Sequence, residues 1–182
     1  MTTFEYVSVL LAIVISLAFT HLVMGIVRLI QSRGIKLSFV YLGWIGLLLF
    51  FCVDYWFSIW HARNADVWTL AFVAFLLLMV TVLYATCGFA VPEAAVSDGV
   101  NLDEFHRANR RKYLGALFVY TALGFFGNLI IASLQLAMIV SVAQLVLIGI
   151  AWLWSDRRVQ IVTLAGMYAV TGWYAFTFIP AL

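Results

Sequence analysis

The sequence predicts an all-α, polytopic integral membrane protein with six transmembrane helices and both termini on the extracytoplasmic side. Of its 182 residues, 66% are hydrophobic and 10% are charged, whereas soluble domains have about 45–50% apolar and about 25% charged residues. The apolar residues form six long runs, and the basic residues gather in alternate loops. A soluble globule, a disordered chain and a nucleic-acid-binding protein are excluded, because too few charges remain to cover a surface or neutralise phosphates.

Each apolar run is long enough to cross a bilayer. A helix rises about 1.5 Å per residue and the hydrocarbon core is about 30 Å thick, so a span needs roughly 20 apolar residues. The runs are Phe4–Ile30, Leu37–Trp60, Val67–Val91, Tyr113–Ser133, Leu136–Trp154 and Val159–Ile179. They lack the alternation of barrel strands, so helices are expected. The first run follows no basic segment and no cleavage signal, and we interpret it as a retained span.

The basic residues predict the orientation. Nine of the ten lie at or after the end of the first run, precede the fourth or separate the last two, and Arg63 alone falls on the other side. By the positive-inside rule these three loops are cytoplasmic. The expected location is a bacterial-type inner cell membrane, with residues 1–182 forming one domain in the lipid bilayer. Six helices in so short a chain bury little of one another, so we expect a homo-oligomer.

The longest loop, at about residues 93–112, is polar and basic. Asn101 predicts a helix start, because Glu104 follows three residues later as in a capping box. A short interfacial helix is expected to lead from there into the fourth span. Its basic residues form a cytoplasmic surface for anionic lipid headgroups or, alternatively, for a cytosolic partner: Arg107, Arg110, Arg111 and Lys112.

Polar residues inside the second span predict a functional layer. Asp54, Ser58 and His61 are spaced at i, i+4 and i+7, which places them on one helical face. Ionisable residues within spans are costly and commonly functional. We expect Asp54 to bind protons or cations, with Asn128 and Gln144 as neutral ligands on an ion or substrate pathway. The alternative is a structural hydrogen bond from Asp54 to Asn128 that fastens two helices.

His21 is the other polar residue predicted deep in a span, about 10 Å from the cytoplasmic boundary. It is expected to serve as an inner station on the pathway, or as a neutral histidine bonded to a neighbouring tyrosine such as Tyr84 or Tyr120. A haem ligand is a further alternative. His61 and His106 belong to other levels, so two histidines of one subunit are not expected to hold a haem. The sequence predicts neither a cofactor nor a metal.

Two other patterns are expected to be structural. Cys52 and Cys87 are predicted at different depths, which argues against a disulfide and against a cysteine-based metal site. Small residues recur every four positions along the first span, a spacing typical of close helix packing: Ser8, Ala12, Ser16 and Thr20.

These features favour a small channel or transporter for protons, cations or a small polar solute. The alternative is a non-transporting sensor, effector or accessory subunit that signals through its basic cytoplasmic loop. A third possibility is an intramembrane redox or lipid enzyme that acts on lipid or quinone, using His21 and nearby tyrosines. No GxSxG, HExxH or phosphate-loop motif is present in the sequence. A transport function is therefore expected rather than an enzymatic one.

Overall fold

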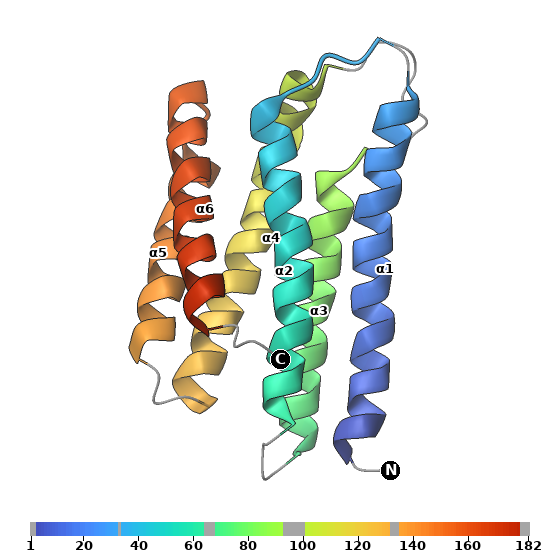
Figure 1. The fold of residues 1–182 in the computed structure, drawn as a ribbon, viewed down its shortest axis with the longest axis vertical. Coiled ribbons are helices and arrows are strands. Elements are labelled where there is room, and N and C mark those ends of the chain that lie inside the picture. The colour runs from blue at the N-terminus through green and yellow to red at the C-terminus, as the bar shows by residue number, and fades with distance from the viewer. Residues whose placement is uncertain (1–2, 33, 64–67, 93–100, 132–134, 179–182) are drawn as a thin grey trace.

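The computed structural model describes residues 3–32, 34–63, 68–92, 101–131 and 135–178. It shows an all-α fold in which each predicted run overlaps one of six helices of the described residues (Figure 1). The helices are α1 (Thr3–Gln31), α2 (Phe39–Ala62), α3 (Leu70–Ala90), α4 (Leu102–Ile131), α5 (Gln135–Leu153) and α6 (Arg157–Phe178). Outside them, the described part has an isolated parallel bridge between Lys36 and Asn101.

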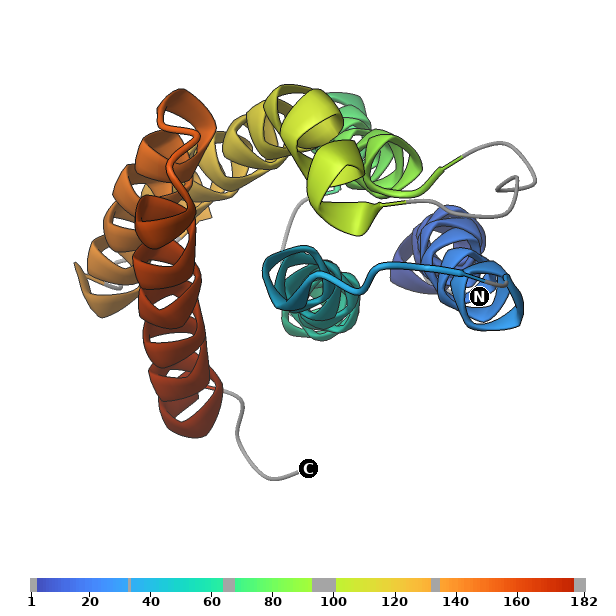
Figure 2. The ribbon, with the colours of Figure 1, turned by 90° about the horizontal axis from the view of Figure 1, so that it is seen from above.

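Five helices form a curved wall in the order α1, α3, α4, α5 and α6, and α2 lies on its concave side (Figure 2). α1 packs on α3, α3 on α4, α4 on α5, and α5 on α6, while α2 contacts α1, α3, α4 and α6. Seen along the helices, α2 lies on the concave side of the row (Figure 2). In the described part of the chain α1 and α6 make no mutual contact. The wall is therefore open along one side of α2.

Aromatic side chains of α2 form much of the core. Tyr41, Trp44 and Tyr55 are fully buried, as expected for a helix that is hydrophobic around its whole circumference. The Tyr41 hydroxyl donates to the carbonyl oxygen of Ala90 at 2.9 Å, and that of Tyr55 donates to the carbonyl of Leu76 at 2.7 Å. These bonds satisfy the two buried hydroxyl groups. They also join α2 to α3 at two points, Leu76 and the last residue of α3, Ala90.

The helix surfaces indicate a multi-pass membrane protein. Four helices, α1, α2, α3 and α6, are long and apolar enough to cross a bilayer, and α5 contains a shorter apolar stretch, Met138–Leu153. Large apolar side chains face outward from the bundle, among them Ile13, Leu17, Leu78 and Val162. Such a surface is suited to lipid rather than to water.

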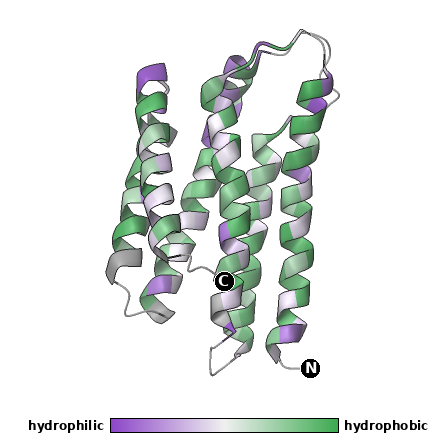
Figure 3. Ribbon diagram, viewed as in Figure 1, coloured by the Kyte–Doolittle hydropathy of each residue, from purple (hydrophilic) through white to green (hydrophobic). Residues whose placement is uncertain are grey.

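Hydrophilic residues gather at one end of the bundle, where α1, α3 and α5 end and α2, α4 and α6 begin (Figures 1 and 3). We call it the basic end. It carries Arg28, Lys36, Arg107, Arg110, Arg111, Lys112, Arg157 and Arg158; Arg33 lies outside the described residues. α1 begins and α6 ends toward the opposite end of the bundle (Figure 1).

The beginning of α4 confirms one sequence prediction and corrects another. The side-chain oxygen of Asn101 accepts a hydrogen bond from the backbone N–H of Asp103 at 3.1 Å, and its amide donates to Glu104 at 3.0 Å. The predicted cap is thus present, with Glu104 bonded to the cap's side chain. The expected short interfacial helix is not separate, however. It forms the first turns of α4, which continues without a break to Ile131.

The close approach of α1 to the end of α3 requires a glycine. A Cβ atom added at Gly25 would lie 2.2 Å from Cγ1 of Val91, whose side chain is buried. We expect Gly25→Ala to lower the free energy of unfolding by about 1–3 kcal/mol through overpacking. Gly88→Ala is the control, because a Cβ at Gly88 meets no atom within 4 Å. Denaturant unfolding in detergent measures both, and equal stabilities would contradict the packing.

Candidate functional site

Asp54 interacts with one tyrosine from each of two other helices. Asp54 is half-buried on α2, and the Tyr174 hydroxyl of α6 forms a hydrogen bond with its side chain. The Tyr120 phenol of α4 is buried and interacts electrostatically with both residues. We call these three residues the carboxyl cluster. A carboxyl group bonded to a phenol hydroxyl keeps a donor partner when it is ionised, which lowers the cost of a charge in an apolar region.

Gln144, on α5, contacts the face of α6 that also carries Tyr174. It is buried, and its Nε2 donates to Oγ1 of Thr171 at 3.4 Å. Thr171 lies three residues before Tyr174, so the two side chains occupy adjacent turns on one side of α6. The structure therefore brings Asp54 and Gln144 to a common helix, although each binds a different residue of it.

The other residues predicted on the ion pathway differ in burial and in hydrogen bonding. Ser58 is exposed, and its hydroxyl donates to the backbone carbonyl of Asp54 at 2.9 Å, which is a bond within α2. Asn128 is half-buried on α4. The side chain of His61 lies outside the described residues. His21 is half-buried on α1, and among the described residues its buried Nε2 has no hydrogen-bond partner.

A second polar cluster lies at the basic end, and we call it the capping cluster. The Tyr113 hydroxyl lies 2.6 Å from Nδ1 of His106, whose Nε2 lies 3.3 Å from Oε1 of Gln160. The Gln160 amide donates to the carbonyls of Ala151 and Trp154 at 2.6 and 2.7 Å. Since Oε1 can only accept, Nε2 of the neutral ring donates to it, and Tyr113 donates to Nδ1.

Arg110 completes the capping cluster. Its Nη1 donates to the carbonyls of Ala151, Trp152 and Trp154 at 3.0, 2.7 and 3.4 Å. These carbonyls stand at the end of α5, where the helix leaves them without internal partners and carries its partial negative charge. A guanidinium satisfies both requirements. The cluster thus ties the first turns of α4 to α5 and α6.

The burial of Arg110 corrects its predicted place on the cytoplasmic basic surface. Arg110 is only 5% exposed and points into the bundle, whereas Arg107, Arg111 and Lys112 are exposed. His106 and Gln160, the other polar members of the cluster on α4 and α6, were not predicted as site residues. The spacing of His106, Arg110 and Tyr113 at i, i+4 and i+7 was an available signal of a shared helix face.

Burial of His106 predicts a pH-dependent stability. Burial, reinforced by the nearby Arg110 charge, lowers the pKa of His106 to about 4, against about 6.5 in an unfolded chain. Stability from this group is complete above about pH 6.5 and falls toward about pH 4, by about 3 kcal/mol in total. Unfolding in detergent across this range measures it. His106→Asn should lose this dependence, and an unchanged slope in the variant would contradict the assignment.

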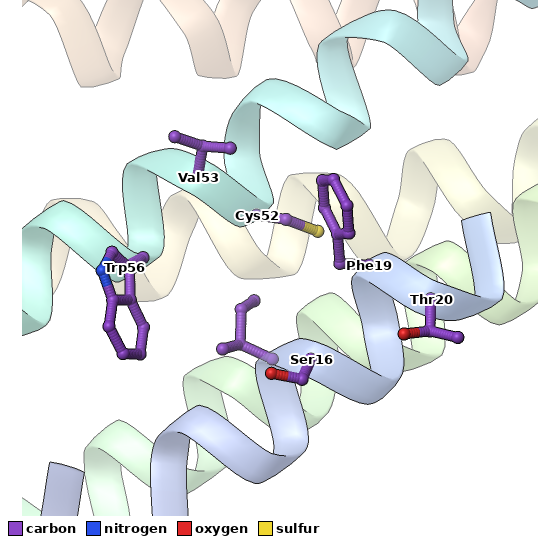
Figure 4. Close-up of a pocket in the computed structure, with 7 residues that line it drawn as sticks. Ser16, Phe19, Thr20, Cys52, Val53 and Trp56 are labelled. Atoms are coloured by element: carbon purple, nitrogen blue, oxygen red, sulfur yellow. The ribbon is translucent and has the colours of Figure 1, made fainter. Parts of the chain in front are cut away.

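The cysteines overturn the prediction of different depths. Sγ of Cys52 on α2 and Sγ of Cys87 on α3 are 3.8 Å apart, and both side chains are buried. Cys52 also lines a groove of about 410 Å³ between α1 and α2, together with Ile15, Ser16, Phe19, Thr20, Val53 and Trp56 (Figure 4). Ser16 and Thr20 were predicted to pack closely against another helix. This prediction is wrong for both, because their side chains are exposed beside the groove. α1 packs instead through a stripe that includes Leu11, Ala18 and Gly25.

Comparisons with known proteins add no family assignment. Searches with protein-family models, of curated proteins and of solved structures found no match to the chain. Among the described residues, no group of three or more His, Cys, Asp or Glu side chains is arranged to hold a metal ion. Functional inference therefore depends on the chemistry of the carboxyl cluster, the capping cluster and the groove.

Proposed function

We propose that this chain is a small membrane transporter or channel that carries protons or small cations, with Asp54 as its ion-binding group. The supporting observation is the carboxyl cluster, in which an ionisable side chain of α2 meets phenol groups of α4 and α6. A carboxyl group that exchanges a proton or a cation needs neutral donors that adjust to both states. Tyrosine hydroxyls meet this need, because they both donate and accept.

The proposed topology has six spans, with the basic end cytoplasmic and both termini extracytoplasmic. α4 and α5 are the two proposed spans besides α1, α2, α3 and α6, because every charged residue of α4 precedes Tyr113 and α5 carries no charged residue. The one-sided distribution of Arg and Lys supports this orientation. In a bacterial-type inner membrane, Asp54 then lies in the extracytoplasmic half. The open side of the wall next to α2 is the surface that we assign to a homo-oligomer.

Flux into proteoliposomes tests the proposal. The purified protein is reconstituted with an entrapped dye that is sensitive to pH, to sodium or to potassium, and the matching ion gradient is imposed in turn. We expect flux of at least one of these ions well above that of protein-free liposomes. Flux no greater than in protein-free liposomes, with the protein folded and inserted, would overturn the transport function.

A second candidate, a non-transporting sensor or accessory subunit, is favoured by the basic end. Arg107 and Arg111 are exposed on α4, directly beside Arg110, which is fixed to α5. A ligand on this surface therefore acts on a helix that is coupled to its neighbours. Neutralising Arg107, Arg111 and Lys112 together should abolish activity in cells under this candidate. Under the transport proposal the same variant should retain ion flux.

A further inference from the structure

The cysteine pair and the groove beside it have a chemistry that the transport proposal does not use. The thiols of Cys52 and Cys87 are in contact, at 3.8 Å, although they come from different helices. A disulfide has an S–S distance of about 2.05 Å, so the two sulfurs must approach each other by about 1.8 Å to be joined. Two thiols in contact can together release two electrons and two protons.

The groove brings one of these thiols within reach of the lipid phase. Figure 4 shows the Cys52 sulfur directed toward α1, where Phe19 and Thr20 line the facing wall. Its volume of about 410 Å³ falls in the usual range for small-molecule sites, about 300–1,000 Å³. Most of the lining is apolar, so the groove is suited to a hydrophobic molecule from the bilayer.

The polar groups of the groove narrow the choice of ligand. Ser16 and Thr20 place two hydroxyl groups on α1, one turn apart, and Phe19 and Trp56 supply aromatic surfaces. Hydroxyls donate to carbonyl oxygens, and aromatic rings stack on flat rings. A quinone has both features, a flat ring and two carbonyl oxygens, and its isoprenoid tail keeps it in the membrane.

A proton acceptor lies at the same level. α1 and α3 run parallel, and Gly25 lies beside Val91. One turn earlier on each helix are His21 and Cys87, which therefore share a level in the bundle. Among the described residues the buried Nε2 of His21 has no hydrogen-bond partner, and a neutral imidazole can accept a proton.

We infer that Cys52 and Cys87 form an intramembrane dithiol site that reduces a lipid-soluble quinone bound in the groove between α1 and α2. The two S–H bonds break and one S–S bond forms. Two electrons and two protons pass to the carbonyl oxygens of the quinone, which becomes the hydroquinone. This activity does not depend on Asp54 or on ion flux.

Quinone reduction by the purified full-length protein tests the inference. The protein is reduced in detergent, freed of reductant under anaerobic conditions and mixed with a benzoquinone that carries a decyl tail. We expect one hydroquinone per chain by absorbance and the loss of both free thiols by alkylation and mass spectrometry. Free thiols that persist in excess quinone would overturn the inference, and so would hydroquinone formation by Cys52→Ser or Cys87→Ser.

Groove variants test where the quinone binds. Thr20→Val removes a hydroxyl from the groove with little change in volume, and we expect the rate to fall about tenfold. Thr81→Val is the matched control, because Thr81 is exposed on α3 and bonds to its own helix at Leu77. Equal rates for the two variants, with both folded by circular dichroism, would overturn the groove as the binding site.

Discussion

Replacing Arg110 with methionine is expected to lower the free energy of unfolding by about 3–5 kcal/mol. Methionine keeps much of the apolar stem but leaves the carbonyl groups at the end of α5 without their charged donor. Arg110→Lys should recover part of the loss, since an ammonium group restores charge but not the planar fork of donors. Denaturant unfolding in detergent measures each variant.

Arg107→Met and Arg111→Met are the controls for this result. Both arginines are exposed on the same turns of α4, so each substitution should change stability by less than about 0.5 kcal/mol. If all three methionine variants were equally stable, Arg110 would be one more surface charge, and the capping cluster would have no structural role.

Replacing Asp54 with asparagine is expected to abolish ion flux and to leave folding intact. Asparagine is nearly isosteric and still accepts a hydrogen bond from Tyr174, but it neither ionises nor exchanges a proton. Tyr174→Phe removes the bond and keeps the volume. We expect it to reduce flux by about tenfold, as for the loss of one hydrogen bond to a charged group. The measurement is flux in proteoliposomes, normalised to the inserted protein.

Asp156→Asn is the matched control for Asp54→Asn. Asp156 is exposed before α6, where its carboxylate accepts a hydrogen bond from the backbone N–H of Arg158 at 2.8 Å. Asparagine keeps this capping contact, so flux should remain at the wild-type level. Wild-type flux in Asp54→Asn would remove Asp54 from the transport mechanism and leave it a structural link between α2 and α6.

The helices were predictable from the sequence because lipid imposes strong and simple constraints. Apolar runs of roughly 20 residues form helices in lipid because their backbone groups must bond internally, and each predicted run overlaps one helix of the described residues. The cap at Asn101 was also predictable, since capping depends on neighbouring residues. α4 begins earlier than its predicted span because charged residues interrupt an apolar run without interrupting a helix.

The contacts between helices could not be predicted in the same way. Depth counted along each run placed Cys52 and Cys87 apart, but their distance depends on how α2 is seated in the hollow against α3. Arg110 was assigned to the surface because a basic residue at the end of a span usually faces headgroups. Its burial depends on the end of α5, which is distant in sequence. The spacing of His106, Arg110 and Tyr113 marks a shared helix face, but no local pattern identifies the distant helix that this face contacts.

Ion transport through Asp54 requires that water reach position 54 from the extracytoplasmic side. The Cys52→Ser and Cys87→Ser substitutions provide a background without cysteine, and Asp54→Cys is compared in it with Leu48→Cys, at a buried position of α2. A membrane-impermeant thiol reagent is added to the outside of intact cells. We expect it to label the Asp54→Cys protein and to leave the Leu48→Cys protein unlabelled. An Asp54→Cys protein that only a membrane-permeant reagent labels would contradict ion transport through Asp54.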